Sequence, residues 1–392
     1  MTDDPRSVVR RQGWPESASR PVVTPLSPSV VYASEGPDAL DAQYEGRAPG
    51  YAYAREGHPN WTVLSDKLAW MEGAAAGVVT GSGMAAIGAV FLSELTAGDH
   101  VVAGDQLYGR SLRLLRHELP RMGVEVTFAD PTDGAAFAAA LRPETRLVLV
   151  EVVSNPTIRV ADMAAIEAAC RDAGVPLAVD NTFTTPALFQ PLARGAAYTI
   201  HSVTKLLAGH SDATLGWVGT RDAERAGRLT DVAVSWGMTP SPFDCWLAER
   251  GLHSFDLRLA RAQSNAAALA DRLAELPGVE AVLYPTRPDH PDHNRAMALL
   301  GCRGGNMVSF RLAGGRAAVT RFVEAAANIP FAPTLGDVAT TVSHPPSSSH
   351  RGLTAEERAD LGITEGFLRV SVGIEDEALL LREVTAAVEA AR

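Results

Sequence analysis

Six short apolar segments between residues 100 and 220 constrain the fold of this chain more than any other feature. They cover residues 100–105, 124–130, 146–153, 176–182, 196–204 and 215–220, and helical patterns such as 111–121 and 162–173 separate several of them. Near-continuous apolar strands that alternate with helices are typical of a mostly parallel sheet with helices on both faces. We therefore expect a large α/β domain built on such a sheet.

The sequence pattern differs on either side of this region. Residues 1–60 are irregular and rich in proline, glycine and aromatic residues, so we expect an arm that lies on another surface. A helix over 61–71, a glycine-rich turn and a helix over 84–95 follow. After Pro242, a long helical stretch over 243–276 precedes apolar runs at 307–312 and 367–373, a helix near 315–327 and a final helix. The predicted units are the arm (1–60), a large domain (61–250) and a smaller α+β domain (251–392).

Composition excludes several classes of function. The net charge of 35 − 46 = −11 argues against a nucleic-acid-binding surface, which needs a basic patch. The uncharged stretch 73–93 contains five glycines, which favours a loop before a buried helix over a membrane span. Three widely spaced cysteines (Cys170, Cys245 and Cys302) predict no disulfide framework, no metal site and a cytoplasmic location. Residues 1–16 lack the apolar region of a secretory signal.

Lysine is rare in this chain, which narrows the search for amine chemistry. It occurs only as Lys67 and Lys205, whereas arginine supplies the other 33 basic residues. Lys205 follows an apolar strand, where open α/β sheets place ligands, and Ser202 and Thr204 flank it. A surface lysine in a loop is the alternative. A lysine beside hydroxyl groups that can donate to a phosphate suits pyridoxal phosphate (PLP), because the amine forms a Schiff base with its aldehyde.

Two other segments supply what a PLP site needs. In GSGMAA (81–86), Gly81 and Gly83 allow close backbone approach, and the start of the next helix points N–H groups at an anion. Glycine turns before helices are common, so this signal is weak alone. Asp180 ends the apolar run 176–180, where an unpaired carboxylate is costly. A helix cap or turn residue is the alternative, and a protonated pyridine nitrogen is a suitable partner.

The order and spacing of nine motifs from about residue 21 to the C-terminus resemble one family. They are YAYAREGHPN (51–60), SGMAA (82–86), DQLYG (105–109), SNPT (154–157), VDNTF (179–183), HSVTKLLAGHSD (201–212), SPFDCWLAERGL (241–252), LGDVATTVSHP (335–345) and LRVSVGIED (368–376). The chain resembles the Cys/Met-metabolism PLP enzymes of PLP fold type I. The resemblance implies an arm, a large domain with a mostly parallel seven-stranded sheet, and a small C-terminal α+β domain.

The resemblance also implies roles for individual residues. Lys205 would form the Schiff base and shuttle protons, Asp180 would bind the pyridine nitrogen, and Tyr108 would stack on the ring and assist proton transfer. Arg369 would bind the substrate α-carboxylate, since a planar guanidinium pairs with both oxygens. The phosphate would be held by Ser202, Thr204, Gly83 and Met84, and the same end of the substrate site would include Thr334 and Asn155.

The arm would complete the site of a neighbouring subunit. The resemblance implies that Tyr53 and Arg55 reach the phosphate bound by another copy of the chain. A dimer would then be the smallest active unit, and members of the family are commonly tetramers. The expected partners are therefore an amino-acid substrate and further copies of this chain, without nucleic acid or membrane.

Departures from the family pattern bear on the reaction. Arg110 stands where many members carry a small residue, Glu56 where some carry a second arginine, and Ala339 where cystathionine-handling members often carry glutamate. Arg113 matches an arginine in several members. We expect a lyase that acts on sulfur amino acids by γ- or β-elimination, giving a 2-oxo acid, ammonia and a thiol. The alternative is γ-replacement on an O-acyl-homoserine, and Arg110 and Arg113 are candidate substrate contacts in either case.

Overall fold

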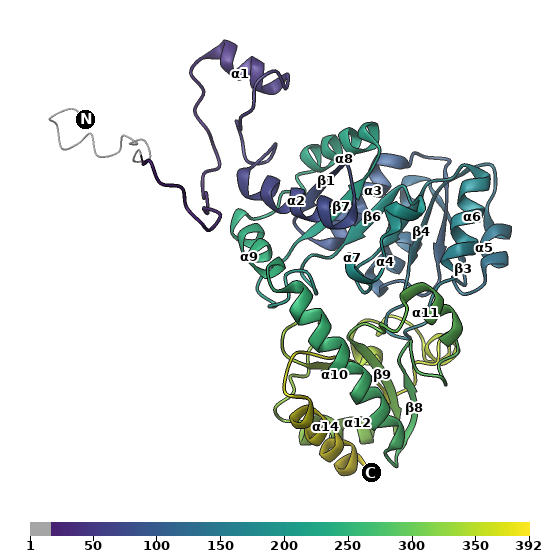
Figure 1. Cartoon of the computed structure of the whole chain (residues 1–392). Coiled ribbons are helices and arrows are strands. Elements are labelled where there is room, and N and C mark those ends of the chain that lie inside the picture. The colour runs from purple at the N-terminus through teal and green to yellow at the C-terminus, as the bar shows by residue number, and fades with distance from the viewer. Residues whose placement is uncertain (1–16) are drawn as a thin grey trace.

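A seven-stranded sheet forms the centre of the larger part of the molecule (Figure 1). The computed structural model describes residues 17–392, so the predicted lack of a secretory signal concerns residues 1–16, which lie outside the described residues. The strand order is β1-β7-β6-β5-β4-β2-β3. Strands β2 to β6 run parallel, whereas β7 pairs antiparallel with both β6 and β1. The expected mostly parallel, seven-stranded sheet is confirmed.

All six predicted strands are present, and one strand was not predicted. The strands are β1 (Ala76–Thr80), β2 (His100–Gly104), β3 (Glu125–Ala129), β4 (Thr145–Glu151), β5 (Leu177–Asp180), β6 (Tyr198–His201) and β7 (Gly216–Thr220). The unpredicted β1 lies in the glycine-rich stretch, where Gly77 makes room for the Trp217 ring. A Cβ on Gly77 would come within 2.4 Å of that ring.

Helices cover both faces of this sheet because alternate strand residues point to opposite sides. Leu147 and Leu149 of β4 pack into a core with α3 (Gly83–Glu94) and α8 (Ala223–Ser235). Val148 and Val150 pack into a second core with α5 (Gly134–Ala140) and α6 (Met163–Ala173). The remaining helices of this part are α2 (Pro59–Glu72), α4 (Gly109–Arg113), α7 (Thr185–Leu188) and α9 (Pro242–Leu252).

Two predicted helices are divided in the structure. The predicted helix over 111–121 consists of α4, a π-helical turn (Leu114–Glu118) and a 3₁₀ turn that begins at Pro120. The predicted helix over 243–276 is α9 followed by α10 (Phe255–Glu275). Arg258 stabilises the second break, since its guanidinium donates to the carbonyl oxygens of Gly251 (2.9 Å) and Leu206 (2.8 Å).

The C-terminal part contains an antiparallel sheet in the order β10-β11-β9-β8. Its strands are β8 (Val279–Leu283), β9 (Met307–Leu312), β10 (Thr341–Ser343) and β11 (Phe367–Ser371). Its helices, besides α10, are α11 (His293–Leu300), α12 (Gly315–Ala325), α13 (Ala355–Asp360) and α14 (Glu377–Ala391). Leu368 and Val370 of β11 pack in the core with α10, α12 and α14. Arg369, between them, therefore points to the opposite face of the sheet.

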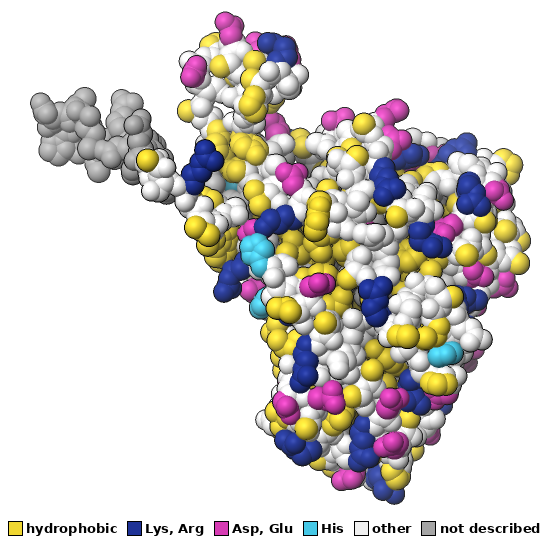
Figure 2. Space-filling view, in the orientation of Figure 1, with side chains coloured by type: hydrophobic (Ala, Val, Ile, Leu, Met, Phe, Trp, Pro, Cys, Tyr) yellow, Lys and Arg dark blue, Asp and Glu magenta, His cyan; other side chains and the backbone are white. Residues whose placement is uncertain are grey.

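The arm stands away from the body of the molecule and has no core (Figure 1). Its helix α1 (Pro37–Tyr44) contains no buried residue, and Val22, Val30 and Val31 are exposed. Figure 2 shows hydrophobic side chains gathered where the arm meets the body, while charges of both signs are interspersed elsewhere on this face. The unit boundaries after residues 60 and 250 stay predictions, and α9 runs across the second one.

Residues 17–392 contain neither a candidate membrane span nor a candidate metal cluster. No helix there is long and apolar enough to cross a membrane. Within the same range, no group of three or more His, Cys, Asp or Glu side chains could hold a metal ion.

Candidate active site

A cavity of about 860 Å³ lies at the carboxyl ends of the parallel strands, between the two sheets. Parallel strands end at one sheet edge, which is where open α/β sheets place ligands. Most of the predicted site residues line this cavity: Lys205, Tyr108, Asp180, Ser202, Thr204, Gly83, Met84, Arg369, Thr334, Asn155, Arg110 and Arg113. Tyr53 and Arg55 do not.

Asp180 is the last residue of β5 and faces the cavity. One carboxylate oxygen accepts from the Thr182 hydroxyl (2.6 Å) and the Thr182 N–H (3.1 Å). Burial raises the pKa of Asp180, which these hydrogen bonds partly oppose. Among the described residues no Lys, Arg or His forms an ion pair with this carboxylate, so it is available to a cationic ligand group.

Glu151 is a cavity residue that the sequence analysis missed. It ends β4 and lies directly beside Asp180 in the parallel register. Its Oε1 accepts from the backbone N–H of Tyr108 at 2.6 Å, which fixes the start of α4. Burial and the neighbouring Asp180 charge raise the pKa of Glu151 well above its ordinary value. The signal that identified Asp180, an acid at the end of an apolar strand, was also present here.

Lys205 lies four residues after β6 and is largely buried. Its Nζ donates to the Thr334 hydroxyl at 3.4 Å. Burial, with the nearby Arg369 cation, lowers the pKa of Lys205. A larger fraction of the amine is therefore neutral at a given pH, which is the form that attacks a carbonyl carbon.

The N-terminus of α3 meets the loop after β6 at very short range. Ser82 is the N-cap of α3, and its hydroxyl accepts from the Ala85 N–H at 3.1 Å. The first N–H groups of a helix have no acceptor within it, so those of Gly83 and Met84 are free to bind an anion. A Cβ on Gly83 would lie 2.8 Å from Cβ and 3.0 Å from Oγ of Ser202. Only glycine permits this approach.

The two predicted phosphate hydroxyls differ in their surroundings. Thr204 Oγ1 donates to the Leu215 carbonyl oxygen (3.1 Å) and accepts from the Leu215 N–H (2.9 Å). Its proton is thus used by the backbone. The Ser202 hydroxyl has no partner among the described residues and faces the cavity, which makes Ser202 the better-placed donor.

Arg369 is a buried cation, 4% exposed, held only by neutral groups. Its guanidinium donates to Asn155 Oδ1 and to the Thr334 carbonyl oxygen, both at 2.7 Å. Its Nε is buried without a hydrogen-bond partner in the described part of the chain. Burial lowers the pKa of Arg369 to about 10. A carboxylate is the group that would satisfy this donor and compensate the buried charge.

Arginines cluster on another wall of the cavity. Arg110, Arg113 and Arg116 are three residues apart on the helix that follows Tyr108, and Arg351 lies in the loop 347–353. No carboxylate of residues 17–392 forms an ion pair with any of these four. This wall therefore carries positive charge, although the chain as a whole is acidic.

The arm residues lie apart from the cavity of their own chain. Tyr53 is 42% exposed, and the Arg55 guanidinium lies over its ring at 5.6 Å. Arg55 also donates to the Val234 carbonyl oxygen (3.4 Å) and to Glu56 (3.3 Å). Their placement leaves both side chains accessible.

A buried polar group behind the site was also missed. Glu72 accepts from His201 and from Asn181 Nδ2 (2.9 Å), and all three side chains are buried. His201 precedes Ser202 and Asn181 follows Asp180, so Glu72 ties together the ends of β5 and β6. No local pattern links residue 72 to residues 181 and 201, because the contact depends on the tertiary fold.

These groups fit one kind of ligand. The free N–H groups at the start of α3, with the Ser202 hydroxyl close to them, suit a phosphate. The Asp180 carboxylate suits a protonated ring nitrogen, and Lys205 offers an amine whose pKa is lowered. The fold and the site define the class of PLP-dependent enzymes of fold type I.

Comparisons with known proteins place the chain within this class. The family model for Cys/Met metabolism PLP-dependent enzymes matches residues 7–389. An L-methionine gamma-lyase of Porphyromonas gingivalis is 36% identical over 92% of this chain and 91% of its own length. An O-succinylhomoserine sulfhydrylase of Pseudomonas aeruginosa is 38% identical over 86% and 83%. A cystathionine gamma synthase of Xanthomonas oryzae, solved with cystathionine, has a TM-score of 0.90 at 38% identity, covering 96% and 95%.

The chain belongs to the Cys/Met metabolism PLP-dependent enzyme family. Its cofactor is pyridoxal 5′-phosphate, as predicted, and its fold is PLP fold type I. The relatives include both elimination and replacement enzymes, so membership alone does not select the reaction.

Replacing Gly83 with alanine should weaken cofactor binding. The new Cβ would push Ser202 away from the start of α3. Overpacking of this kind costs about 1–3 kcal/mol, and each 1.4 kcal/mol is about tenfold in Kd. Gly227→Ala is the matched control, since a Cβ there meets nothing within 4 Å. Titration of the apoenzyme with PLP measures both; equal affinity of G83A and wild type would contradict the assigned cradle.

Proposed function

We propose that this enzyme is a lyase that cleaves the carbon–sulfur bond of sulfur-containing amino acids by γ- or β-elimination, in the manner of a cystathionine or methionine γ-lyase. The observation that carries the proposal is the placement of one low-pKa amine next to a carboxylate-binding arginine. Lys205 contacts the Thr334 hydroxyl, and the Thr334 carbonyl accepts from Arg369. A substrate held by Arg369 would present its α-carbon near this amine.

Each residue has a defined task in this proposal. When bound, PLP withdraws electrons from the α-carbon of an amino acid. Asp180 keeps the ring nitrogen protonated, and Ser202 with the start of α3 holds the phosphate. Arg369 and Asn155 orient the α-carboxylate. The Lys205 amine takes the α-proton and returns a proton to the carbon chain, assisted by the Tyr108 hydroxyl.

The overall reaction balances without an oxidant or reductant. The bond between sulfur and the carbon chain breaks, and sulfur leaves as a thiol with one proton. Water replaces the amino group, so that the products are the thiol, a 2-oxo acid and ammonia. The elimination requires proton transfers to and from the carbon chain, and Lys205, held in the cavity near the substrate, would carry them out.

The positively charged cavity wall that carries Arg110, Arg113 and Arg116 favours a second candidate function. Arg110, Arg113 and Arg116 offer fixed positive charge to the distal end of a substrate, since arginine stays protonated. An O-acyl-homoserine with an acidic acyl group would fit such a wall, and a thiol would then replace the acyl group at the γ-carbon. This is γ-replacement, as in a cystathionine γ-synthase or homoserine-ester sulfhydrylase.

A product assay distinguishes the two functions. Purified holoenzyme is given cystathionine, methionine, cysteine or an O-acyl-homoserine, each with and without a thiol. We expect release of 2-oxo acid from a sulfur amino acid without added thiol. Formation of a thioether from the homoserine ester, with little 2-oxo acid from any sulfur amino acid, would instead establish replacement.

Arg110 should control the choice between acidic and apolar substrates. Its charge would favour an anionic tail and disfavour the thiomethyl group of methionine. Arg110→Gly should raise kcat/KM for methionine relative to O-succinylhomoserine or cystathionine by about 1–3 kcal/mol, the scale of a lost charged hydrogen-bond partner. Arg121→Gly, at a nearby residue that does not line the cavity, is the control. If the ratio of the two kcat/KM values does not change, Arg110 takes no part in substrate selection. Glu56, Arg113 and Ala339 would then be the remaining candidates.

We also propose that two chains share each active site, with a tetramer as the complete assembly in the cytoplasm. The exposed Tyr53 and Arg55 and the exposed apolar residues of the arm support a second copy of this chain as the partner. Three cysteines without disulfides support the location. The same arrangement explains why an arm without a core carries two side chains that match the family's phosphate contacts.

Complementation between two inactive variants tests the shared site. Arg55→Ala and Lys205→Ala should each lose activity, and mixtures that are dissociated and reassembled should regain part of it. A mixed dimer holds one site with both residues intact, supplied by different chains. Heterodimers that form and stay inactive would show that each site is built within a single chain.

A further inference from the structure

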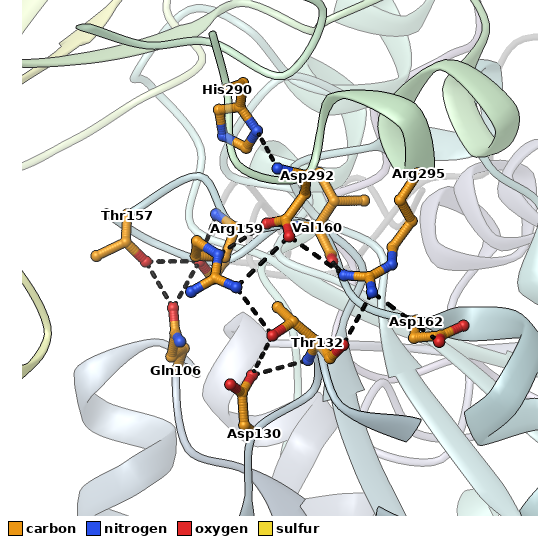
Figure 3. Close-up of polar contacts among 11 residues, drawn as sticks. Gln106, Asp130, Thr132, Thr157, Arg159, Val160, Asp162, His290, Asp292 and Arg295 are labelled. Atoms are coloured by element: carbon orange, nitrogen blue, oxygen red, sulfur yellow. Dashed lines mark hydrogen bonds and ion pairs between the residues drawn. The ribbon is translucent and has the colours of Figure 1, made fainter. Parts of the chain in front are cut away.

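A network of polar contacts lies beside the cavity without lining it (Figure 3). It joins loops that follow the adjacent strands β4, β2 and β3 to the start of α11 in the C-terminal part. Figure 3 shows Arg159 and Arg295 converging on Asp292, with Gln106 and Thr157 at the other end. The proposed chemistry uses none of these side chains.

The centre of the network is an ion pair between the two parts of the molecule. Arg159 Nε donates to Asp292 Oδ2 at 2.7 Å, and Arg159 Nη2 donates to the Thr132 hydroxyl at 2.9 Å. Asp292 also accepts from the Val160 N–H (3.0 Å) and from Arg295 (3.3 Å). Asp292 is 8% exposed. The Arg159 side chain is 30% exposed, and an ion pair that is only partly buried contributes little net stability. The pair therefore matters for the geometry that it fixes.

The geometry it fixes is a tight turn over residues 154–159. The Ser154 N–H donates to the Arg159 carbonyl (2.9 Å), and the Arg159 N–H donates to the Ser154 hydroxyl (3.0 Å). Ile158 within this turn has φ of 58°, which is costly for a β-branched residue and persists only where surrounding contacts impose it. The Arg159–Asp292 pair is one such contact, at the end of the turn.

Other contacts hold the remainder of the turn. The Thr157 hydroxyl donates to Gln106 Oε1 (2.7 Å), and the Ser309 hydroxyl of β9 donates to the Pro156 carbonyl (2.7 Å). Asn155 is thus the one side chain of the turn directed to Arg369, with Oδ1 accepting at 2.7 Å. A continuous set of contacts therefore runs from Asp292 through the turn to Arg369.

We propose that Arg159 and Asp292 are a positioning pair that sets Asn155 and, through it, aims Arg369 at the substrate α-carboxylate. The inference rests on the proposed function for the role of Arg369. It does not depend on whether the enzyme eliminates or replaces.

Replacing Arg159 should affect substrate binding and spare the cofactor. Arg159→Met releases the turn, and we expect KM for the preferred amino acid to rise about tenfold while kcat changes less than threefold. Gly83 and Ser202 follow β1 and β6, and Asp180 is the last residue of β5, so none of them belongs to the turn over 154–159. PLP affinity and the cofactor absorbance spectrum should therefore stay as in wild type. Arg159→Lys keeps the charge and should recover part of the loss.

The matched control is another two-point ion pair away from the cavity. Arg194 donates to both oxygens of Glu167, at 2.7 and 2.9 Å. Arg194→Met should leave KM and kcat unchanged. Asp292→Asn preserves the shape of the pair and should also raise KM, by a smaller factor than R159M. This second variant keeps the proposal testable if R159M does not fold.

Glycine binding separates this inference from the identity of the reaction. Glycine has an α-carboxylate and no leaving group, and its binding to holoenzyme is followed by the change in cofactor absorbance. We expect R159M to raise the Kd of glycine about tenfold. A double-mutant cycle with Asn155→Ala should show that R159M adds little once Asn155 is absent. An unchanged Kd in R159M, or independent effects of the two substitutions, would overturn the proposal whatever products the enzyme makes.

Discussion

The parallel alignment of β4, β5 and β6 is the constraint on which the site depends. It brings Glu151, Asp180 and Ser202 to the same edge of the sheet, although 51 positions separate the first from the last. The start of α3 can reach this edge only because glycine stands at position 83 and at position 216, where a Cβ would lie 2.1 Å from the Ser82 carbonyl. Strand pairing thus fixes the positions of the Asp180 carboxylate and the Ser202 hydroxyl. The two glycines, which have no side chain, let the start of α3 approach them.

Burial shifts three charged groups of the cavity, two from the large domain and one from the small sheet, toward their neutral forms. The pKa of Asp180 is raised, and the pKa values of Lys205 and Arg369 are lowered. Such groups destabilise the empty site, and ligands that supply the opposite charge relieve that cost. Glu151 has a different task, because its Oε1 accepts from the Tyr108 N–H and so holds the start of α4. Glu151 thus stabilises one wall of the cavity, while the neighbouring Asp180 carboxylate remains available to a ligand.

Local sequence patterns predict the parts of this structure that depend on local physics. The apolar runs predict all six strands from β2 to β7, and strand ends identify Asp180 and Lys205. What was missed depends on contacts between distant residues: Glu72 beneath His201, Arg258 at the break between α9 and α10, and the loop 347–353 across from α4. β1 was not predicted because its one glycine, Gly77, which makes room for Trp217, lies in a glycine-rich stretch that resembles a loop. Glu151 could have been predicted by the argument used for Asp180.

The two sheets divide the work of the site, and this explains why the reaction is harder to assign than the cofactor. The large sheet supplies the groups proposed for PLP, and the small sheet supplies Arg369, whose proposed partner is the α-carboxylate common to all amino acids. Neither the groups proposed for PLP nor Arg369 therefore distinguishes one leaving group from another. The groups that could distinguish one substrate tail from another lie on the remaining wall, which consists of α4, the turn after it and the loop 347–353. The proposed dimer would add residues from the arm of a second chain. Arg110 and Arg116 on that wall are exposed and have no acidic partner among residues 17–392. The proposed selection of the substrate tail therefore depends on the part of the cavity where the fold constrains side chains least.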